Sequence, residues 1–164
     1  MRVALLAAAL TLGLDQASKL WVIHALELPR RLAIDVVPPF LNFRMAWNTG
    51  VNFGLFAGEG EVTRWALVAL AVAISVGVWV WVSRQPPRGV LHVSAGLLVG
   101  GALGNVIDRV AYGAVADFIN MSCCGFENPF AFNIADIGIF AGAVGLVLFS
   151  GGDGDAKARP DKTP

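Results

Sequence analysis

The chain has 164 residues, of which 56% are hydrophobic and only 15% charged, and its mean hydropathy is +0.66. Soluble domains carry about 45–50% apolar and about 25% charged residues, so this composition favours a membrane protein and excludes a disordered chain. The 12 basic and 12 acidic residues cancel, which leaves no positive field to attract nucleic acid, so we expect no nucleic-acid partner.

Four apolar stretches predict membrane-spanning helices, because a helix needs about 20 mostly apolar residues to cross the hydrocarbon core. They lie at about residues 3–26, 62–82, 90–108 and 135–150. Glycines recur at every fourth residue in the last two stretches: Gly96, Gly100 and Gly104, then Gly138 and Gly142. Small residues at this spacing predict close packing between helices in lipid.

The first stretch also has features of a cleaved secretory signal peptide, because Arg2 precedes an apolar run. Its small-residue triplet Ala7–Ala9 lies inside that run, which is too early for a cleavage site. The apolar pattern then resumes as far as Ile23. We therefore interpret the first stretch as a retained helix.

Short strands are predicted outside the apolar stretches. Residues 27–61 form a β-rich loop in which Leu32–Val37 and Leu41–Trp47 are rich in apolar and β-branched residues. Pro38–Pro39 separates these two segments and predicts a turn. Val115–Met121 alternates in polarity and predicts a third strand.

Four spans would place both ends of the chain on one side of the membrane. Arg84 and Arg88 lie in the short loop on that side, so the positive-inside rule places both termini in the cytoplasm. The β-rich loop and the segment 109–134 then share the outer side. We predict a single polytopic membrane domain over residues 1–150 and a disordered cytoplasmic tail over residues 151–164.

Five charged residues lie in or beside the predicted spans: Asp15, Lys19, Asp108, Arg109 and Asp136. A charge at the bilayer centre costs about 2.5–3.5 kcal/mol on insertion scales, so such residues are either paired or functional. Asp15 and Lys19 are four residues apart and share one helix face, which predicts an ion pair. A purely structural role, in which charged pairs join neighbouring helices, is the alternative interpretation.

Asp117 and Asp136 differ from the other acidic residues because neither has a basic neighbour at helical spacing. Asp117 follows the third span and Asp136 opens the fourth, so antiparallel helices would bring them together. Two close carboxylates share one proton and act in turn as base and acid on a water molecule, as in aspartic peptidases. The residues alone leave open that both are ordinary solvated loop aspartates.

Other catalytic classes have weaker support. The chain has neither the His-Glu-x-x-His motif of zinc peptidases nor a Gly-x-Ser-x-Gly nucleophile motif. The adjacent cysteines Cys123 and Cys124 give neither a disulfide framework nor zinc-ligand spacing and are interpreted as loop residues.

An ion-coupled carrier would show internal repeats, which the sequence lacks. A structural membrane subunit remains as a further alternative.

Five segments, in this order, resemble sequence blocks of the lipoprotein signal peptidase (signal peptidase II) family: Asp15–Lys19 (DQASK), Asn48–Gly54 (NTGVNFG), Gly100–Arg109 (GGALGNVIDR), Gly113–Phe118 (GAVADF) and Phe132–Asp136 (FNIAD). Single blocks are weakly diagnostic, but five in order are specific. Ala116 replaces the usual valine and Asn52 a commonly small residue. These departures bear on substrate preference and not on the chemistry.

The resemblance implies an aspartic endopeptidase of the bacterial inner membrane, without metal or organic cofactor. Such an enzyme removes the signal peptide from diacylglyceryl-modified prolipoproteins by cleaving before the lipidated cysteine, at the periplasmic side. Asp117 and Asp136 correspond to the catalytic pair. Six further residues fall on positions that bind substrate or support the site: Asp15, Lys19, Asn48, Asn105, Arg109 and Asn133. We expect a monomer surrounded by phospholipid, with residues Ser122–Pro129 as a lid.

Overall fold

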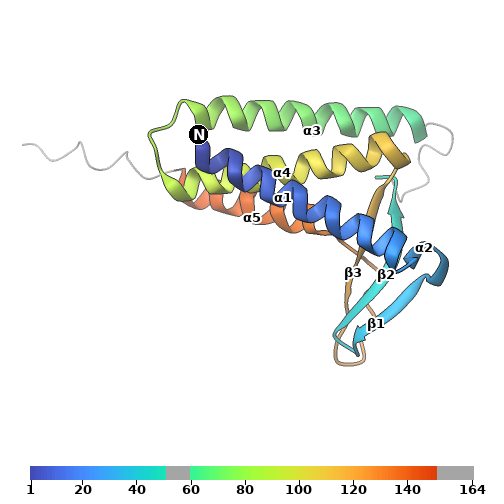
Figure 1. The fold of residues 1–164 in the computed structure, drawn as a ribbon. Helices are drawn as coiled ribbons and strands as arrows, with labels where there is room; N and C mark the ends of the chain where they lie inside the picture. Colours follow the sequence, from blue (N-terminus) through green and yellow to red (C-terminus); the bar gives the residue numbers. More distant parts are fainter. Residues whose placement is uncertain (51–59, 151–164) are drawn as a thin grey trace, which may run out of the picture.

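Four apolar helices run side by side, and a small sheet projects from one end of them (Figure 1). The structure is a computed structural model and describes residues 1–50 and 60–150. The long helices are α1 (Arg2–Leu20), α3 (Gly60–Ser83), α4 (Gly89–Tyr112) and α5 (Ile134–Phe149). A π-helical turn, η1 (Trp21–Ala25), extends α1. All four apolar stretches predicted from the sequence are therefore helical.

Helix α4 forms the centre of the bundle and packs against α1, α3 and α5. Glycines permit these close approaches, as the sequence predicted. Gly96 of α4 faces the backbone of Ala4 in α1, and a Cβ atom on Gly142 of α5 would lie 2.5 Å from the backbone nitrogen of Leu98 in α4. Larger side chains at these positions would separate the helices.

The outer faces of the helices are apolar and exposed, which is the arrangement that lipid requires. Leu6 of α1 is 63% exposed and Val147 of α5 is 77% exposed. In the described part of the chain, α1 with η1, α3 and α4 are long and apolar enough to cross a membrane. Helix α5 has 16 residues, or about 24 Å, which is shorter than the hydrocarbon core. The helical membrane fold is confirmed, and a fourth complete span stays a prediction.

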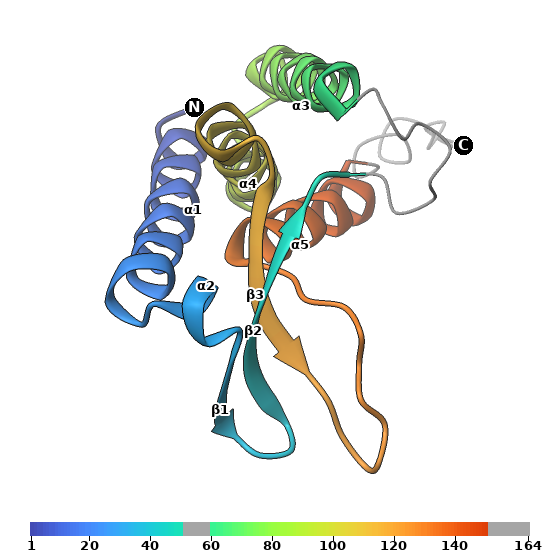
Figure 2. The ribbon, with the colours of Figure 1, turned by 90° about the vertical axis from the view of Figure 1, so that its right-hand side faces the viewer.

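The three predicted strands form one antiparallel sheet in the order β1-β2-β3, seen from its end of the bundle in Figure 2. They are β1 (Ala33–Val37), β2 (Leu41–Asn48) and β3 (Val115–Met121), and a turn containing the Pro38–Pro39 bond joins the first two. In the register, Ala46 of β2 pairs with Asp117 of β3. The sheet therefore places Asp117 beside the end of the helices.

A small apolar core joins the sheet to the end of α1. Val22 of η1, Leu28 and Phe118 of β3 are buried together. Leu28 begins a short helix, α2 (Leu28–Arg31), within the segment 27–61 that was predicted to be a β-rich loop. Pro29 in the first turn of α2 favours this helix, because its fixed backbone angle suits a helix start.

The loop after β3 contains a disulfide between the neighbouring residues Cys123 and Cys124. The sequence alone predicts no disulfide at this pair. The chain reverses tightly here, with Cys124 at φ 59° and the amide of Phe126 donating to the carbonyl oxygen of Cys123 at 2.9 Å. The prediction of a disordered tail over 151–164 and the Asn48–Gly54 block beyond Gly50 lie outside the described residues.

Candidate active site

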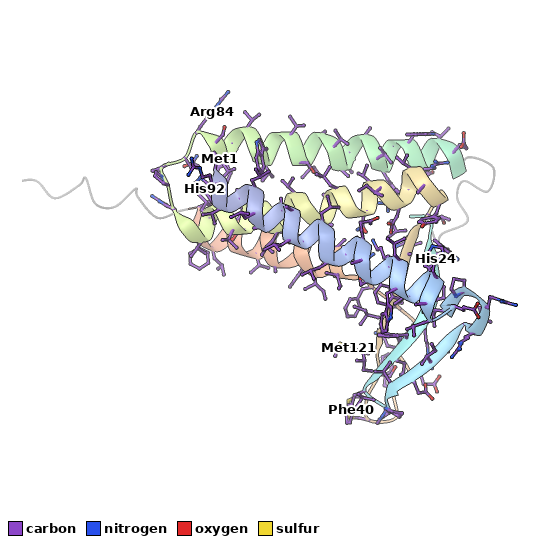
Figure 3. All side chains as sticks on the ribbon, viewed as in Figure 1. Met1, His24, Phe40, Arg84, His92 and Met121 are labelled. Carbon is purple, nitrogen blue, oxygen red and sulfur yellow. A yellow bond between two sulfur atoms is a disulfide. The ribbon has the colours of Figure 1, made fainter. Side chains whose placement is uncertain are left out.

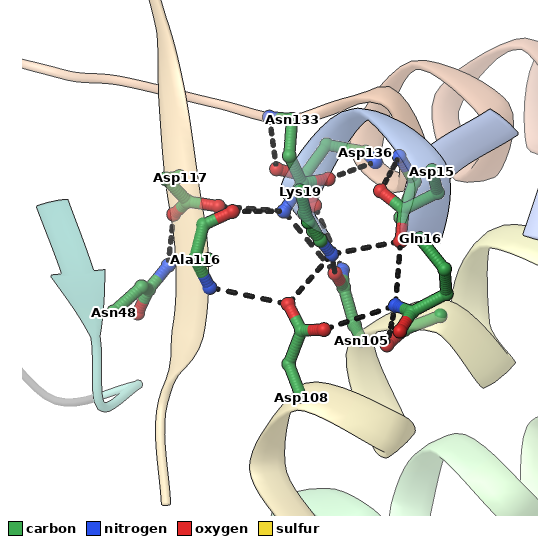
Figure 4. A network of polar contacts seen from close by, with 12 residues as sticks. Asp15, Gln16, Lys19, Asn48, Asn105, Asp108, Ala116, Asp117, Asn133 and Asp136 are labelled. Carbon is green, nitrogen blue, oxygen red and sulfur yellow. Dashed lines mark hydrogen bonds and ion pairs between the residues drawn. The ribbon is translucent and has the colours of Figure 1, made fainter. Parts of the chain in front are cut away.

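A network of buried polar side chains lies where the sheet meets the bundle (Figure 4). Its members come from α1, α4, β2, β3 and the start of α5, and most of them are almost fully buried. The network has two parts: a charged cluster around Lys19, and a layer of asparagines that holds Asp117 and Asp136.

Lys19 is the centre of the charged cluster and is shared by two carboxylates from different helices. Its Nζ lies 2.8 Å from Oδ2 of Asp15 and 2.7 Å from Oδ2 of Asp108. It also donates to Oδ1 of Asn105 at 3.2 Å. The predicted pairing of Asp15 with Lys19 is therefore present, and Asp108 is an additional partner from α4.

The same two carboxylates also hold the backbone just before each candidate catalytic residue. Asp15 accepts a hydrogen bond from the backbone amide of Ala135 at 2.9 Å, and Ala135 precedes Asp136. Asp108 accepts one from the backbone amide of Ala116 at 3.1 Å, and Ala116 precedes Asp117. The cluster around Lys19 therefore holds the backbone next to Asp117 and the backbone next to Asp136.

Gln16 completes the charged cluster. Its Nε2 donates to Oδ2 of Asp15 at 3.1 Å, to Oδ1 of Asp108 at 3.0 Å and to the carbonyl oxygen of Gly104 at 3.2 Å. Every carboxylate oxygen in the cluster therefore has a donor. A buried polar network stabilises one arrangement only when its members are satisfied in this way.

Asn133 is the N-cap of α5 and fixes Asp136 at the start of that helix. Its side-chain oxygen accepts from the backbone amide of Asp136 at 2.8 Å, and Oδ2 of Asp136 accepts from the backbone amide of Asn133 at 3.2 Å. This reciprocal pair is a capping box, formed by an asparagine at the cap and an acidic residue three positions later. The positive end of the α5 dipole also favours negative charge at this position.

Asparagine side chains link the two aspartates. Nδ2 of Asn133 donates to Oδ1 of Asp117 at 2.6 Å, and Asn48 of β2 donates to the other oxygen, Oδ2, at 3.0 Å. Asn105 of α4 donates to Oδ1 of Asp136 at 2.9 Å and accepts from Nδ2 of Asn133 at 3.2 Å. Asp117 and Asp136 therefore lie on either side of Asn133 and face a common polar centre.

The two aspartates have different electrostatic surroundings. Asp117 is 3% exposed, and burial is the main reason why its pKa is raised to about 6. The nearby charge of Asp136 raises this pKa further, whereas the hydrogen bonds from Asn48 and Asn133 lower it. Asp136 is less buried and lies at a helix N-terminus. Burial and the neighbouring carboxylate therefore favour the protonated form of Asp117 more than in an ordinary aspartate.

An apolar groove of about 350 Å³ reaches this site between α3, α4 and α5. Leu67 and Ile74 of α3, together with Ile139 of α5, line its apolar length, whereas Asn105 and Arg109 form its polar end. Nε of Arg109 is buried and has no hydrogen-bond partner within residues 1–50 and 60–150. The groove therefore offers an apolar surface that ends at a cationic side chain beside the aspartates.

Seven of the eight site residues predicted from the sequence belong to the hydrogen-bonded network: Asp15, Lys19, Asn48, Asn105, Asp117, Asn133 and Asp136. Arg109, the eighth, lines the adjacent groove. Gln16 and Asp108 also belong to the network and are not among the site residues predicted from the sequence. Asp108 was visible as a charge inside a span, and Gln16 stands within the Asp15–Lys19 block.

The fold and this site define a helical membrane protein with a buried acidic centre at one end of its bundle. A family model described as signal peptidase (SPase) II matches residues 7–150. The chain belongs to the signal peptidase II family, which confirms the resemblance carried by the five sequence blocks and makes the chain a membrane protease.

Individual relatives are similar over nearly the whole chain. The lipoprotein signal peptidase of Methylobacterium sp. (strain 4-46) is 44% identical over 157 residues, which cover 94% of this chain and 93% of the relative. That of Methylorubrum extorquens (strain PA1) is 49% identical over 153 residues, 91% of this chain and 85% of the relative.

Solved structures with the same fold are also described as bacterial membrane enzymes. One, determined by the in meso method at 2.3 Å resolution, has a TM-score of 0.78 at 26% identity and covers 99% of this chain and 96% of its own. A second structure, at 1.9 Å resolution, has a TM-score of 0.79 at 26% identity and covers 93% of this chain and 95% of its own.

Proposed function

We propose that this chain is an aspartic endopeptidase that removes the signal peptide from diacylglyceryl-modified prolipoproteins by cleaving before the lipidated cysteine. The observation that carries the proposal is the linkage of Asp117 and Asp136 through Asn133. Family membership supports the substrate class, because the relatives are lipoprotein signal peptidases. The acidic pair supplies the chemistry.

In the proposed reaction, Asp136 acts first as the base and Asp117 as the acid. The Asp136 carboxylate removes a proton from water while the water oxygen attacks the scissile carbonyl carbon. Asp117 gives its proton to the carbonyl oxygen, which forms a tetrahedral diol. The proton on Asp136 then passes to the leaving amine as the C–N bond breaks, and a diol hydroxyl returns a proton to Asp117.

The neighbouring residues act by positioning. The asparagines Asn48, Asn105 and Asn133 orient the carboxylate oxygens of the pair. Lys19 fixes the backbone beside each aspartate through Asp15 and Asp108. Such preorganisation contributes to the rate because the reacting groups need not reorganise during the reaction.

The groove between α3, α4 and α5 suits the apolar part of the substrate. A signal peptide is an apolar helix, and the groove offers apolar side chains such as Leu67 and Ile139 along its length. Arg109 lies at the polar end and interacts electrostatically with Asp136, which supports a role in holding a peptide carbonyl or a lipid oxygen there. We assign Arg109 to substrate binding on this ground.

The sheet and the loop after β3 are suited to contact the membrane surface. Phe126 and Phe130 in this loop are 68% and 69% exposed, and Phe40 at the β1–β2 turn is also exposed. Aromatic side chains favour the membrane interface. We propose that the sheet is a platform on the outer surface and that residues Ser122–Pro129 form a lid over bound substrate.

The proposed topology has four spans within one domain, residues 1–150, both termini in the cytoplasm and the active site on the periplasmic side of the inner membrane. Its support is the positive charge of Arg84, which lies at the end of the bundle opposite the sheet (Figure 3), and of Arg88, which follows it in the short connection between α3 and α4. Labelling of single cysteines at Gln85 and Arg31, with Cys123 and Cys124 replaced by serine, tests it. Labelling of both positions from the same side would contradict it.

The function is tested with the purified full chain and a synthetic prolipoprotein whose cysteine carries diacylglyceryl. We expect cleavage on the amino side of that cysteine and little cleavage of the same precursor with an unmodified cysteine. Failure to cleave the lipidated precursor, or a chelator-sensitive cleavage, would contradict the proposal.

A further inference from the structure

The disulfide between the neighbouring residues Cys123 and Cys124 lies at the tip of the loop after β3. Both side chains are exposed, and the chain holds no other cysteine. Both line a cavity beside Phe40, which Figure 3 labels at the end of the sheet farthest from the helices. Met121, just before the tip, is four residues beyond Asp117 on β3, or about 13 Å at the rise of a strand. The pair therefore lies outside the active site.

This disulfide contributes little to holding the fold together. No residue separates the two cysteines, so the bond encloses the shortest possible segment of chain. In the chain-entropy account, a disulfide stabilises a fold by restricting the unfolded chain, and the effect grows with the number of residues enclosed. A bond between neighbours restricts the unfolded chain least. Its position points to a role other than stability.

The base of the loop is held by hydrogen bonds that do not involve the cysteines. Asn120 of β3 is 1% exposed, and its Nδ2 donates to the carbonyl oxygens of Asn128 at 2.7 Å and Phe130 at 2.8 Å. The hydroxyl of Ser122 donates to Oδ1 of Asn120 at 3.0 Å and accepts from the backbone amide of Asn128 at 3.2 Å. The local influence of the disulfide is therefore confined to the tip, residues 123–127.

At the tip, the disulfide restricts a backbone conformation that is unfavourable for one of its own residues. Cys124 has φ 59°, and the amide of Phe126 donates to the carbonyl oxygen of Cys123 at 2.9 Å. A residue with a Cβ atom favours the right-handed backbone over this left-handed one by about tenfold. Opening the disulfide frees Cys124 to leave the left-handed region, and the turn that holds Phe126 then opens.

The two sulfur atoms are also accessible to a reagent. Both cysteines are exposed and line a cavity of about 460 Å³ together with Phe40, Met121 and Phe126. Exchange requires a thiolate to reach a sulfur atom, so exposed disulfides are the readily reduced ones, whereas structural disulfides resist reduction. In the proposed topology the loop lies on the oxidising, periplasmic side, where the disulfide is the resting state.

We propose that Cys123–Cys124 is a redox-active disulfide, opened by a dithiol reductant, whose state sets the conformation of the loop tip. A thiolate of the reductant attacks the sulfur of one cysteine, the S–S bond breaks, and the other cysteine leaves as a thiolate and takes up a proton. The second thiol of the reductant then displaces the first cysteine as a thiol. In total, two electrons and two protons pass to the pair, and the reductant becomes a cyclic disulfide.

The tip belongs to the segment proposed as a lid, so its redox state regulates the proposed function at the step of substrate binding. Phe126 is 68% exposed and moves when the turn opens, whereas Asp117 and Asp136 keep their hydrogen bonds. Exchange at the pair does not depend on the proposed function. Its effect on cleavage rests on that function, so the two are measured separately.

The first experiment follows the pair in the purified full chain, in detergent micelles, without reference to cleavage. The chain is equilibrated with mixtures of reduced and oxidised dithiothreitol, free thiols are alkylated, and the mass is measured. We expect no thiol in the chain as purified and two thiols, appearing together, on reduction. Hydrogen exchange at the amide of Phe126 should then rise about tenfold, while the amide of Asn128, at the base of the loop, is the unchanged control.

Three outcomes of this experiment would overturn the proposal: two free thiols in the chain as purified, a disulfide that stays closed in excess dithiothreitol, or unchanged exchange at Phe126 once two thiols are counted.

The second experiment measures cleavage of the lipidated precursor by the oxidised chain, the reduced chain and the double variant Cys123→Ser/Cys124→Ser. We expect reduction to raise KM by up to about tenfold with kcat unchanged, and the double variant to match the reduced chain with or without dithiothreitol. An unchanged KM in the reduced chain, or a double variant that still responds to dithiothreitol, would overturn the regulation. Absence of cleavage in every form would contradict the proposed function instead, and the thiol count with Phe126 exchange would still decide the proposal.

Discussion

The side-chain amide of Asn133 donates a 2.6 Å hydrogen bond to Oδ1 of Asp117. Asn133 also caps α5 by accepting from the backbone amide of Asp136. One side chain therefore begins a helix and sets the separation of two acidic groups. The start of α5 and the candidate active site are therefore parts of the same local structure.

This double role predicts that two substitutions of Asn133 separate stability from activity. Serine is a good N-cap but has no amide to reach Asp117, whereas alanine cannot cap. We expect Asn133→Ala to lower the free energy of unfolding by about 1 kcal/mol more than Asn133→Ser. Both should lower the cleavage rate, by about 100-fold, because the acidic pair is misplaced. A fully active Asn133→Ser variant would show that the Asp117 contact is dispensable.

Because Lys19 pairs with two buried carboxylates, we predict that replacing it lowers the free energy of unfolding more than any other single replacement in the charged cluster. Lys19→Met leaves Asp15 and Asp108 buried without a cation, which should lower the free energy of unfolding by about 3–5 kcal/mol. The exposed pair Arg30–Glu27 supplies the control, and Arg30→Met should cost less than about 1 kcal/mol.

A double variant that lacks both Asp15 and Lys19 should not regain the stability lost in Lys19→Met, because Asp108 would remain without its cation. A triple variant, Asp15→Asn/Lys19→Met/Asp108→Asn, should recover part of the loss, since no charge remains in the cluster around Lys19. Melting in detergent measures each variant. Equal melting temperatures for Lys19→Met and the Arg30→Met control would contradict the pairing.

The tight packing of α4 against α1 predicts different effects of alanine at two helical glycines. A Cβ on Gly104 would lie 2.5 Å from Oδ2 of Asp15, whereas one on Gly77 of α3 would meet nothing within 4 Å. We expect Gly104→Ala to displace Asp15 and lower both the melting temperature and the cleavage rate. Gly77→Ala should be neutral or slightly stabilising, because alanine favours helices. A harmless Gly104→Ala would contradict the packing described.

The helices and strands were predictable because their signals are local. Apolar stretches of spanning length mark the helices, and the alternation in Val115–Met121 marks β3. The helix α2 was not predicted, because its single buried anchor, Leu28, becomes visible only when it packs against Phe118. The disulfide between Cys123 and Cys124 likewise depends on the turn, which the residues alone did not indicate.

Most of the candidate site was predictable only through family resemblance, because its contacts are remote in sequence. Gln16 bonds Asp108 across 92 residues, and no periodicity in either helix predicts which faces meet. The i,i+4 pair of Asp15 and Lys19 is local and was predicted from spacing. The second carboxylate on Lys19 depends on how α1 and α4 pack, so spacing could not provide it.

The raised pKa of Asp117 predicts a dependence of stability on pH. Its ordinary value is 3.8 and its value in the folded chain is about 6, so between these pH values the folded state binds more protons than the unfolded state. Stability should therefore fall as pH rises from about 4 to about 6, by at most about 3 kcal/mol. Asp117→Asn should lack this part of the pH dependence in a melting series.

The carboxyl group of Asp117 should also make the cleavage activity depend on pH. If Asp117 supplies the proton to the scissile carbonyl, kcat/KM falls as pH rises through about 6. A kcat/KM that rises through this range would assign the base role to Asp117 instead. Substrate binding should change little over the same range, since the groove is mainly apolar.

The most direct test of the acidic pair is cleavage of the lipidated precursor by Asp117→Asn, Asp136→Asn and the double variant. Asparagine keeps the shape of each side chain but cannot transfer the proton. Asp35→Asn, at an exposed position in β1, controls for loss of a carboxylate. We predict that each single variant folds, binds precursor and loses cleavage, and that the double variant is no slower than either, because the two residues act as a unit. Substantial cleavage by either single variant would contradict the proposed mechanism.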